Sequence, residues 1–153
     1  MPDLLVNLLK LPPLEDHDGF ILRRAQPFEL SAVRQFVAEN FSPKWADEIS
    51  VGFTRQPITV FIATIDREIA GFAAYECTRR GFFGPTGVLQ SAQGRGIGKA
   101  LLLASLRALH EMGYVYAIIG AAGPVRFYQK TVGAIIIPDS EPGIYTDSLK
   151  TKE

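Results

Sequence analysis

The feature that most constrains this chain is a glycine-rich stretch, residues 93–100, that directly precedes a leucine-rich run ending at Met112. Glycine adds no side-chain packing and costs backbone entropy, so the three glycines of this stretch indicate a tight turn or close contact with a ligand. A helix N-terminus presents free N–H groups and the positive end of the helix dipole, and together they attract phosphate. The stretch therefore predicts an anion-binding loop at the start of a helix. A glycine-rich turn without a ligand is the alternative.

Two common phosphate-binding motifs do not fit this loop. A Walker loop needs Gly five residues before the Gly-Lys pair and Ser or Thr after it, but Gln93 and Ala100 occupy those positions. The dinucleotide fingerprint G-x-G-x-x-G would end on Lys99 or Leu101 instead of Gly. No acidic residue follows about twenty residues later to hold a ribose. A nucleotide-binding protein is thus disfavoured.

Composition excludes several other classes of protein. Sixteen basic and sixteen acidic residues cancel, so no overall field favours nucleic acid or an anionic membrane. One cysteine cannot form an internal disulfide, which suits a reducing cytoplasm. The apolar run at residues 4–9 is too short for a signal peptide, and no run approaches the roughly twenty residues of a membrane span. We expect a single cytoplasmic domain over residues 1–153, of which 1–19 form a short N-terminal extension.

Apolar periodicity and turn residues predict a mixed α/β fold. Residues 4–9 form either an edge strand or a helical turn. Strands are expected at residues 20–25, 58–66, 69–78, 82–89, 114–120, 134–137 and near 144–149. Helices are expected at residues 27–40, 97–112 and 125–132. A further helix is expected to begin with Ser42 as its N-cap, and Gly113 is expected to be the C-terminal cap of the helix at 97–112. Antiparallel strands followed by a βαβ crossover predict a mixed sheet with helices on both faces.

The loop fits one further pattern, Q/R-x-x-G-x-G/A, through Gln93, Gly96 and Gly98. In this it resembles the acetyl-CoA pyrophosphate loop of the GCN5-related N-acetyltransferase (GNAT) family. Other positions that match the family are Gly71-Phe72, Val88, Gly113, Phe127-Tyr128, Lys130 and Gly133. The departures are Ser91 in place of Pro or an acidic residue, Ala121 in place of Asn, and one extra residue, Val132.

The resemblance implies a mostly antiparallel sheet of six to seven strands, with helices on both faces and a splayed central strand pair. It also implies an acetyl-CoA-dependent N-acetyltransferase that transfers the acetyl group directly to a primary amine, without a metal. The implied contacts to acetyl-CoA come from the strand before the loop, the loop itself and the helix after the apolar strand. They are Val88, Leu89, Gln93, Gly94, Arg95, Gly96, Ile97, Gly98, Lys99, Ala100 and Tyr128.

Two residues are candidates for the chemistry. The resemblance implies that Tyr128 is the general acid that protonates the departing thiolate, with the Val88 N–H facing the carbonyl oxygen. Glu76 is the one acid inside the predicted strand pair and is a candidate general base, with a solvated surface carboxylate as the alternative. Strand alternation places Glu76 with Phe72 on one face and Cys77 on the other. Buried cysteine is usually inert packing, and we expect that of Cys77.

The acceptor is open at this stage. The helix pair at residues 27–56 resembles the variable acceptor-binding region of the family. If Asp47 and Glu48 face the cleft they favour a cationic acceptor; otherwise they are solvated. A small-molecule amine or a protein amino group is expected as acceptor, with no nucleic acid and no membrane as partner. The alternative function is a non-catalytic acyl-CoA-binding module. Dimerisation is common in the family, and the last strands or the N-terminal apolar run could serve it.

Overall fold

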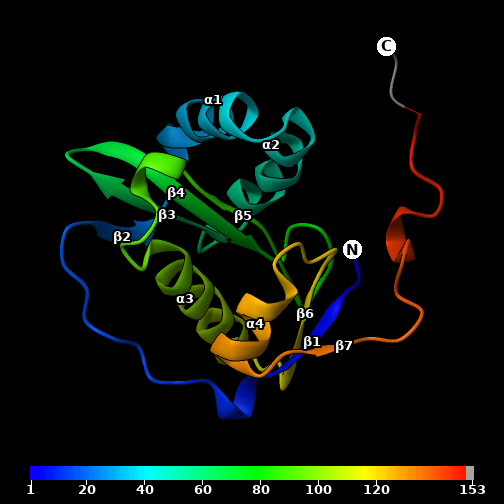
Figure 1. Cartoon of the computed structure of the whole chain (residues 1–153). Coiled ribbons are helices and arrows are strands. Elements are labelled where there is room, and N and C mark those ends of the chain that lie inside the picture. The colour runs from blue at the N-terminus through cyan, green and yellow to red at the C-terminus, as the bar shows by residue number, and fades with distance from the viewer. Residues whose placement is uncertain (151–153) are drawn as a thin grey trace.

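The computed structural model describes residues 1–150, which form a seven-stranded sheet in the order β2-β3-β4-β5-β6-β1-β7 (Figure 1). The strands are β1 (Leu4–Asn7), β2 (Ile21–Arg24), β3 (Val60–Ile65), β4 (Glu68–Tyr75), β5 (Phe82–Val88), β6 (Tyr116–Ile119) and β7 (Ile135–Ile136). The α-helices are α1 (Leu30–Asn40), α2 (Pro43–Ser50), α3 (Ile97–Glu111) and α4 (Val125–Val132). The predicted mixed, mostly antiparallel sheet is confirmed.

The central pair β5–β6 is parallel, whereas the other paired strands are antiparallel. It pairs only at Phe82 with Ile118 and Phe83 with Ile119. From Gly84 onward the two strands separate, which confirms the predicted splay. The sequence supplies a reason, because Pro85 has no N–H to donate and Gly84 has a φ of +123° that few other residues adopt.

Two apolar layers cover the sheet. Figure 1 shows α1 and α2 on one side of it and α3 and α4 on the other. Phe72 and Ala74 pack with α1 and α2, whereas Ala73 and Tyr75 pack with α3, as strand alternation predicts. The alternation fails at Cys77, which lies in the same layer as Phe72. Glu76 has a φ of +60°, so the strand ends there and the next side chain changes sides.

The N-terminal apolar run forms a strand followed by a short helical turn, but the strand is not the edge strand that the sequence suggested. It begins as β1, which lies between β6 and β7 and is therefore an inner strand, and continues as a 3-10 turn, Leu8–Lys10. Leu4 and Val6 are fully buried. Their partners on β6 are more than 110 positions away, at Ile119 and Ala117, so the local pattern could not show that both edges are paired.

The prediction of a strand near residues 144–149 is wrong. Residues Gly143–Tyr145 form a single 3-10 turn, and no strand follows it up to residue 150. Tyr145 is 43% exposed and Leu149 is 92% exposed. The edge strand at this end of the sheet, β7, has only two residues, so it offers a further strand little to pair with.

Candidate active site

The predicted loop turns twice through backbone conformations that favour glycine. Gly94 has a φ of +85° and Gly96 a φ of +82°, and Gly96 is the N-cap of α3. A Cβ placed on either residue would meet nothing within 4 Å, so crowding by the protein does not explain these glycines. Backbone conformation explains them, and the space beside both residues is open.

The loop amides are available for a ligand. The Gln93 N–H donates to the Gln90 carbonyl, and the first amide bonded back along α3 is that of Ala100, which donates to Gly96 at 3.0 Å. Between these two, no N–H of residues 94–99 donates to an acceptor within residues 1–150. They stand at the N-terminus of a 15-residue helix, where the helix dipole is positive. The arrangement fits a phosphate group.

A cavity of about 530 Å³ runs beside the loop. Most of the predicted contact residues line it: Val88, Gln93, Gly94, Gly96, Ile97, Gly98, Lys99 and Tyr128. The other lining residues were not among the predicted contacts to acetyl-CoA: Phe83, Thr86, Gly87, Ala92, Leu102, Pro124 and Phe127. Ala92 and Leu102 flank the loop in the chain, whereas the others come from β5 and the start of α4 and adjoin the loop only after the chain has folded. For the β5 residues, the partial alternation of small and apolar side chains was the one local feature of the sequence that could have indicated a cavity.

The two predicted strand residues behave differently. The Leu89 N–H donates to the Ala70 carbonyl at 2.8 Å, so it is occupied by β4. Backbone groups alternate in direction along a strand, so those of Val88 point the other way, into the gap between β5 and β6. Of the two, Val88 offers its N–H and C=O to a molecule in the gap.

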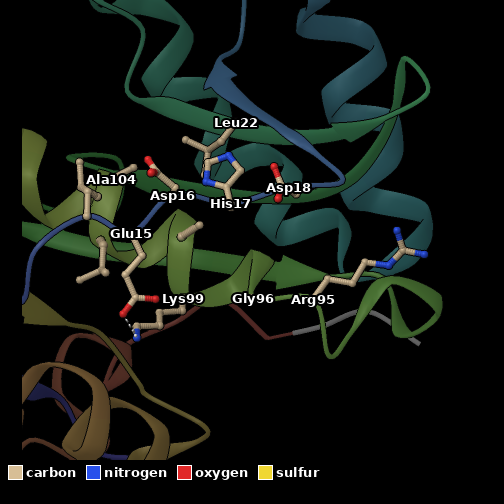
Figure 2. A pocket seen from close by; sticks show the side chains of 12 residues that line it. Glu15, Asp16, His17, Asp18, Leu22, Arg95, Gly96, Lys99 and Ala104 are labelled. Carbon is tan, nitrogen blue, oxygen red and sulfur yellow. Dashed lines mark hydrogen bonds and ion pairs between the residues drawn. The ribbon is translucent and has the colours of Figure 1, made fainter.

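Arg95 and Ala100 do not line the cavity beside the loop. They line a second cavity on the other flank of α3, closed by residues 14–18 and by Leu22 of β2 (Figure 2). Gly96 and Lys99 border both cavities. The Lys99 ammonium is paired with Glu15 at 3.3 Å. The Lys99 charge is therefore shared with an acidic segment that precedes β2.

Tyr128 lines both the cavity beside the loop and a smaller one that adjoins it. It is 4% exposed, on the inner face of α4, and its ring contacts Phe83 and Phe127 edge-on at centroid distances of 6.3 and 5.2 Å. Among the hydrogen bonds of residues 1–150, none involves its hydroxyl. Burial raises the pKa of Tyr128 to about 12, so the phenol stays protonated near neutral pH.

The cavity beside the loop is one end of a channel that continues past Tyr128 to the opposite face of the sheet. A cavity of about 220 Å³ shares Phe83, Thr86, Pro124 and Tyr128 with the first one. It also shares Phe83, Gly84, Pro85 and Trp45 with a cavity of about 340 Å³ below α2. The three cavities follow the splay between β5 and β6. A molecule entering beside the loop can thus meet one entering from α2, with Tyr128 close to the meeting point.

The structure does not bring Glu76 into this channel. Its carboxylate is buried and accepts the Gly81 N–H across the turn between β4 and β5. Together with burial, which is the larger cause, the nearby Glu76 carboxylate raises the pKa of Tyr114. Glu76 thus holds a turn, and we assign it no step in the chemistry.

Cys77 lies apart from the channel as well. It is buried, and burial raises the pKa of its thiol to about 11, which leaves little thiolate at neutral pH. Over residues 1–150, no three His, Cys, Asp or Glu side chains gather as a metal site would require. Within the same range, no helix is long and apolar enough to cross a membrane.

Comparison with known proteins gives one family match. Residues 56–131, which include β3, β4, β5, α3 and the loop, match the model of the acetyltransferase (GNAT) domain. Among curated proteins, none matches the sequence.

Solved structures share the fold. A GCN5-related N-acetyltransferase from Sphaerobacter thermophilus is similar with a TM-score of 0.72 and 22% identity, over 89% of this chain and 48% of that one. A glucosamine N-acetyltransferase region of a fungal multi-domain beta-N-acetylglucosaminidase is similar with a TM-score of 0.71 and 17% identity, over 89% and 19%. A GNAT acetyltransferase from Brucella melitensis, in complex with acetyl-CoA, has a TM-score of 0.56 and 24% identity, over 73% and 82%. This chain spans less than half the length of the first two.

Proposed function

Because this chain belongs to the GNAT family of acetyltransferases, we propose that it transfers an acetyl group from acetyl-CoA directly to a primary amine. One observation carries the proposal. The amides of residues 94–99 have no acceptor within residues 1–150, and they border a cavity that leads to the splayed strands. Free amides at a helix start bind a diphosphate, and the splay admits a slender arm such as pantetheine.

The residues present fit acetyl-CoA. The open space beside Gly94 and Gly96 allows the diphosphate to approach the main chain, and Lys99 adds a positive charge. The Val88 carbonyl accepts an amide N–H of the pantetheine arm, as it would from a paired strand, and its N–H stays available for the thioester. Phe127 and Pro124 supply apolar walls on the α4 side.

The reaction then follows from the channel. The nitrogen of a neutral amine attacks the thioester carbon, a C–N bond forms, and the C–S bond breaks. The Val88 N–H stabilises the negative charge that builds on the carbonyl oxygen. The Tyr128 hydroxyl gives its proton to the departing sulfur and regains one from solvent, while the amine loses its proton to water in the channel. No protein base is assigned.

Two measurements test this function. Calorimetry with acetyl-CoA, ATP and NAD should show binding of acetyl-CoA and weak or no binding of the other two. Release of free CoA thiol should then depend on an added amine from a panel. Absence of acetyl-CoA binding would contradict the proposal outright.

The alternative, a non-catalytic acyl-CoA-binding module, predicts a different combination. It would bind acetyl-CoA and release no thiol with any amine. The position of a protonated Tyr128 between the two ends of the channel favours the enzyme, since a module that only binds has no use for a proton donor at that point.

A further inference from the structure

The cavity below α2 has mostly apolar walls and lies at the far end of the channel from the loop. Trp45, Phe83 and Pro85 form its inner part, which continues into the middle cavity beside Tyr128. Tyr145, from the C-terminal 3-10 turn, borders its outer part. An acceptor that reaches Tyr128 from this side must therefore extend along an apolar wall.

One carboxylate stands at the outer end. Among the described residues that line the three cavities of the channel, Glu48 is the sole acidic one. It is half-buried, and one of its oxygens accepts the hydroxyl hydrogen of Thr78. A carboxylate has about four acceptor sites, so Glu48 keeps sites for a ligand ammonium. The bond to Thr78 holds it toward the cavity.

The position of Glu48 on α2 is set by local chemistry. Ser42 caps the helix by accepting the N–H of Lys44 at 3.1 Å, and Pro43 occupies the first helical position. The adjacent carboxylate, Asp47, turns the other way and pairs with Arg34 of α1 at 3.2 Å. Helical spacing then leaves Trp45 and Glu48 on the same face, three residues apart.

Glu48 does not border the middle cavity, whereas Tyr128 does not border the outer one. The amine that reacts beside Tyr128 and the cation that Glu48 can bind are thus separate groups, joined by a spacer that passes Trp45 and Phe83. We propose that the acceptor is a primary amine with a second cationic group at the far end of an apolar spacer, and that Glu48 binds this second group. This inference rests on the proposed function.

Lys44 also borders the outer cavity, one helical turn before Glu48. Its positive charge limits the cations that this end of the channel accepts. A linear diamine therefore fits better than a polyamine with three or more charges. The same reasoning predicts that Lys44→Gln raises the affinity for a diamine, because a like charge is removed from the site.

The experiment compares acceptors of matched length. Linear diamines of three to eight carbons are assayed for CoA release beside the monoamine and the amino alcohol with the same spacer. We expect one spacer length at which kcat/KM for the diamine exceeds that for its monoamine by roughly ten- to hundredfold, the range for a hydrogen bond to a charged group. Equal values at every length would overturn the inference and leave the proposed function standing.

The Glu48→Gln variant keeps the shape of the side chain and an oxygen that can accept from Thr78. It should remove the preference for the diamine through KM, with calorimetric binding of acetyl-CoA unchanged. Asp47→Asn is the matched control and should keep the preference, since that carboxylate faces Arg34. An unaltered preference in Glu48→Gln would refute the role of Glu48.

Binding can be followed without turnover. Trp45 is the one tryptophan in the chain and borders both the outer and the middle cavity, so its fluorescence reports occupancy. With acetyl-CoA replaced by CoA, the diamine should change this fluorescence at lower concentration than the monoamine, and Glu48→Gln should equalise them. If no amine releases CoA but this difference holds, the proposed function fails and the binding inference survives.

Discussion

The Nζ atom of Lys99 lies 3.3 Å from the Oε1 atom of Glu15, and this ion pair stands at the first turn of α3 (Figure 2). Lys99 also borders the cavity beside the loop. A phosphate bound there and the Glu15 carboxylate therefore compete for one ammonium group. Through this competition, the N-terminal segment that carries Glu15 influences the affinity for acetyl-CoA.

Glu15→Gln should consequently strengthen binding of CoA. An exposed ion pair is worth about 0.2–1 kcal/mol, so the Kd should fall by up to about fivefold. Calorimetry measures this. In a Lys99→Met background the same substitution should have no effect, because the competition is gone. An equal gain in both backgrounds would mean that Glu15 acts through the general field and not through Lys99.

Gly96→Ala and Gly98→Ala should separate folding from binding. Gly96 has a φ of +82°, so alanine there should lower the free energy of unfolding by about 1–2 kcal/mol. Gly98 lies within α3, and its added Cβ would lie 3.7 Å from Val88 Cγ2, an ordinary contact. Alanine at 98 should raise stability by roughly 0.5–1 kcal/mol.

Both alanine variants should weaken binding of CoA, Gly96→Ala through the altered amides and Gly98→Ala through the methyl group placed in the cavity. Urea unfolding and calorimetry on the same samples give the two quantities. If Gly98→Ala is stabilised and binds CoA as the unchanged chain does, the ligand does not approach that part of the loop.

Tyr128→Phe should lower kcat by roughly 10²- to 10⁴-fold, the usual range for a general acid, with little change in the Kd of acetyl-CoA. The hydroxyl has no partner within residues 1–150, so removing it should cost little stability. Tyr116→Phe, at a side chain that is 55% exposed, is the control and should keep full turnover. Retained turnover in Tyr128→Phe would assign protonation of the sulfur to water.

The raised pKa of Tyr128 also predicts a pH dependence of stability. The phenol titrates near 10 in the unfolded chain and at about 12 in the folded one. Between these values the unfolded state has lost the proton that the folded state keeps, so the free energy of unfolding falls as pH rises. The loss is about 1.4 kcal/mol per pH unit and is complete near the folded value. Denaturation at pH 9 and 11.5 should show it, and Tyr128→Phe should lack this component.

Ala121→Gly should stabilise the fold by about 0.5–1 kcal/mol. Ala121 has a φ of +44°, and its N–H donates to Asp3 at 2.8 Å, which holds the strained conformation. Glycine adopts this conformation without strain, although it loses part of the gain through a freer unfolded chain. The neighbouring Ala122→Gly should instead destabilise, because Ala122 is buried and its φ is not positive. Thermal unfolding that ranked the two variants the other way would contradict this account.

Local chemistry in the sequence was sufficient for several elements. Ser42 and Pro43 predicted the start of α2, and the Ser42 side chain does accept two amides of its first turn. Gly113, with a φ of +104°, follows the end of α3 as expected. These features depend on backbone preferences within one helical turn, so they are readable without knowledge of distant contacts.

Other expectations required contacts that the sequence does not show. The strand expected near residues 144–149 would have had to pair with β7, which is only two residues long. Glu76 looked like a strand residue facing the gap, yet it leaves the strand through a positive φ and bonds to Gly81. Period-two alternation assumes a strand that continues, so one left-handed residue was enough to reverse the faces of Glu76 and Cys77.

The sequence by itself determined the loop and the helix that follows it, because glycine conformation and helix capping act between near neighbours. Only the tertiary structure decided that the loop, Tyr128 and Glu48 share one channel. These groups come from three different elements. The gap that connects them exists because β5 and β6, which α3 separates in the sequence, pair with each other at one end alone. Where two distant strands stop pairing depends on packing across the whole sheet, which no local pattern encodes.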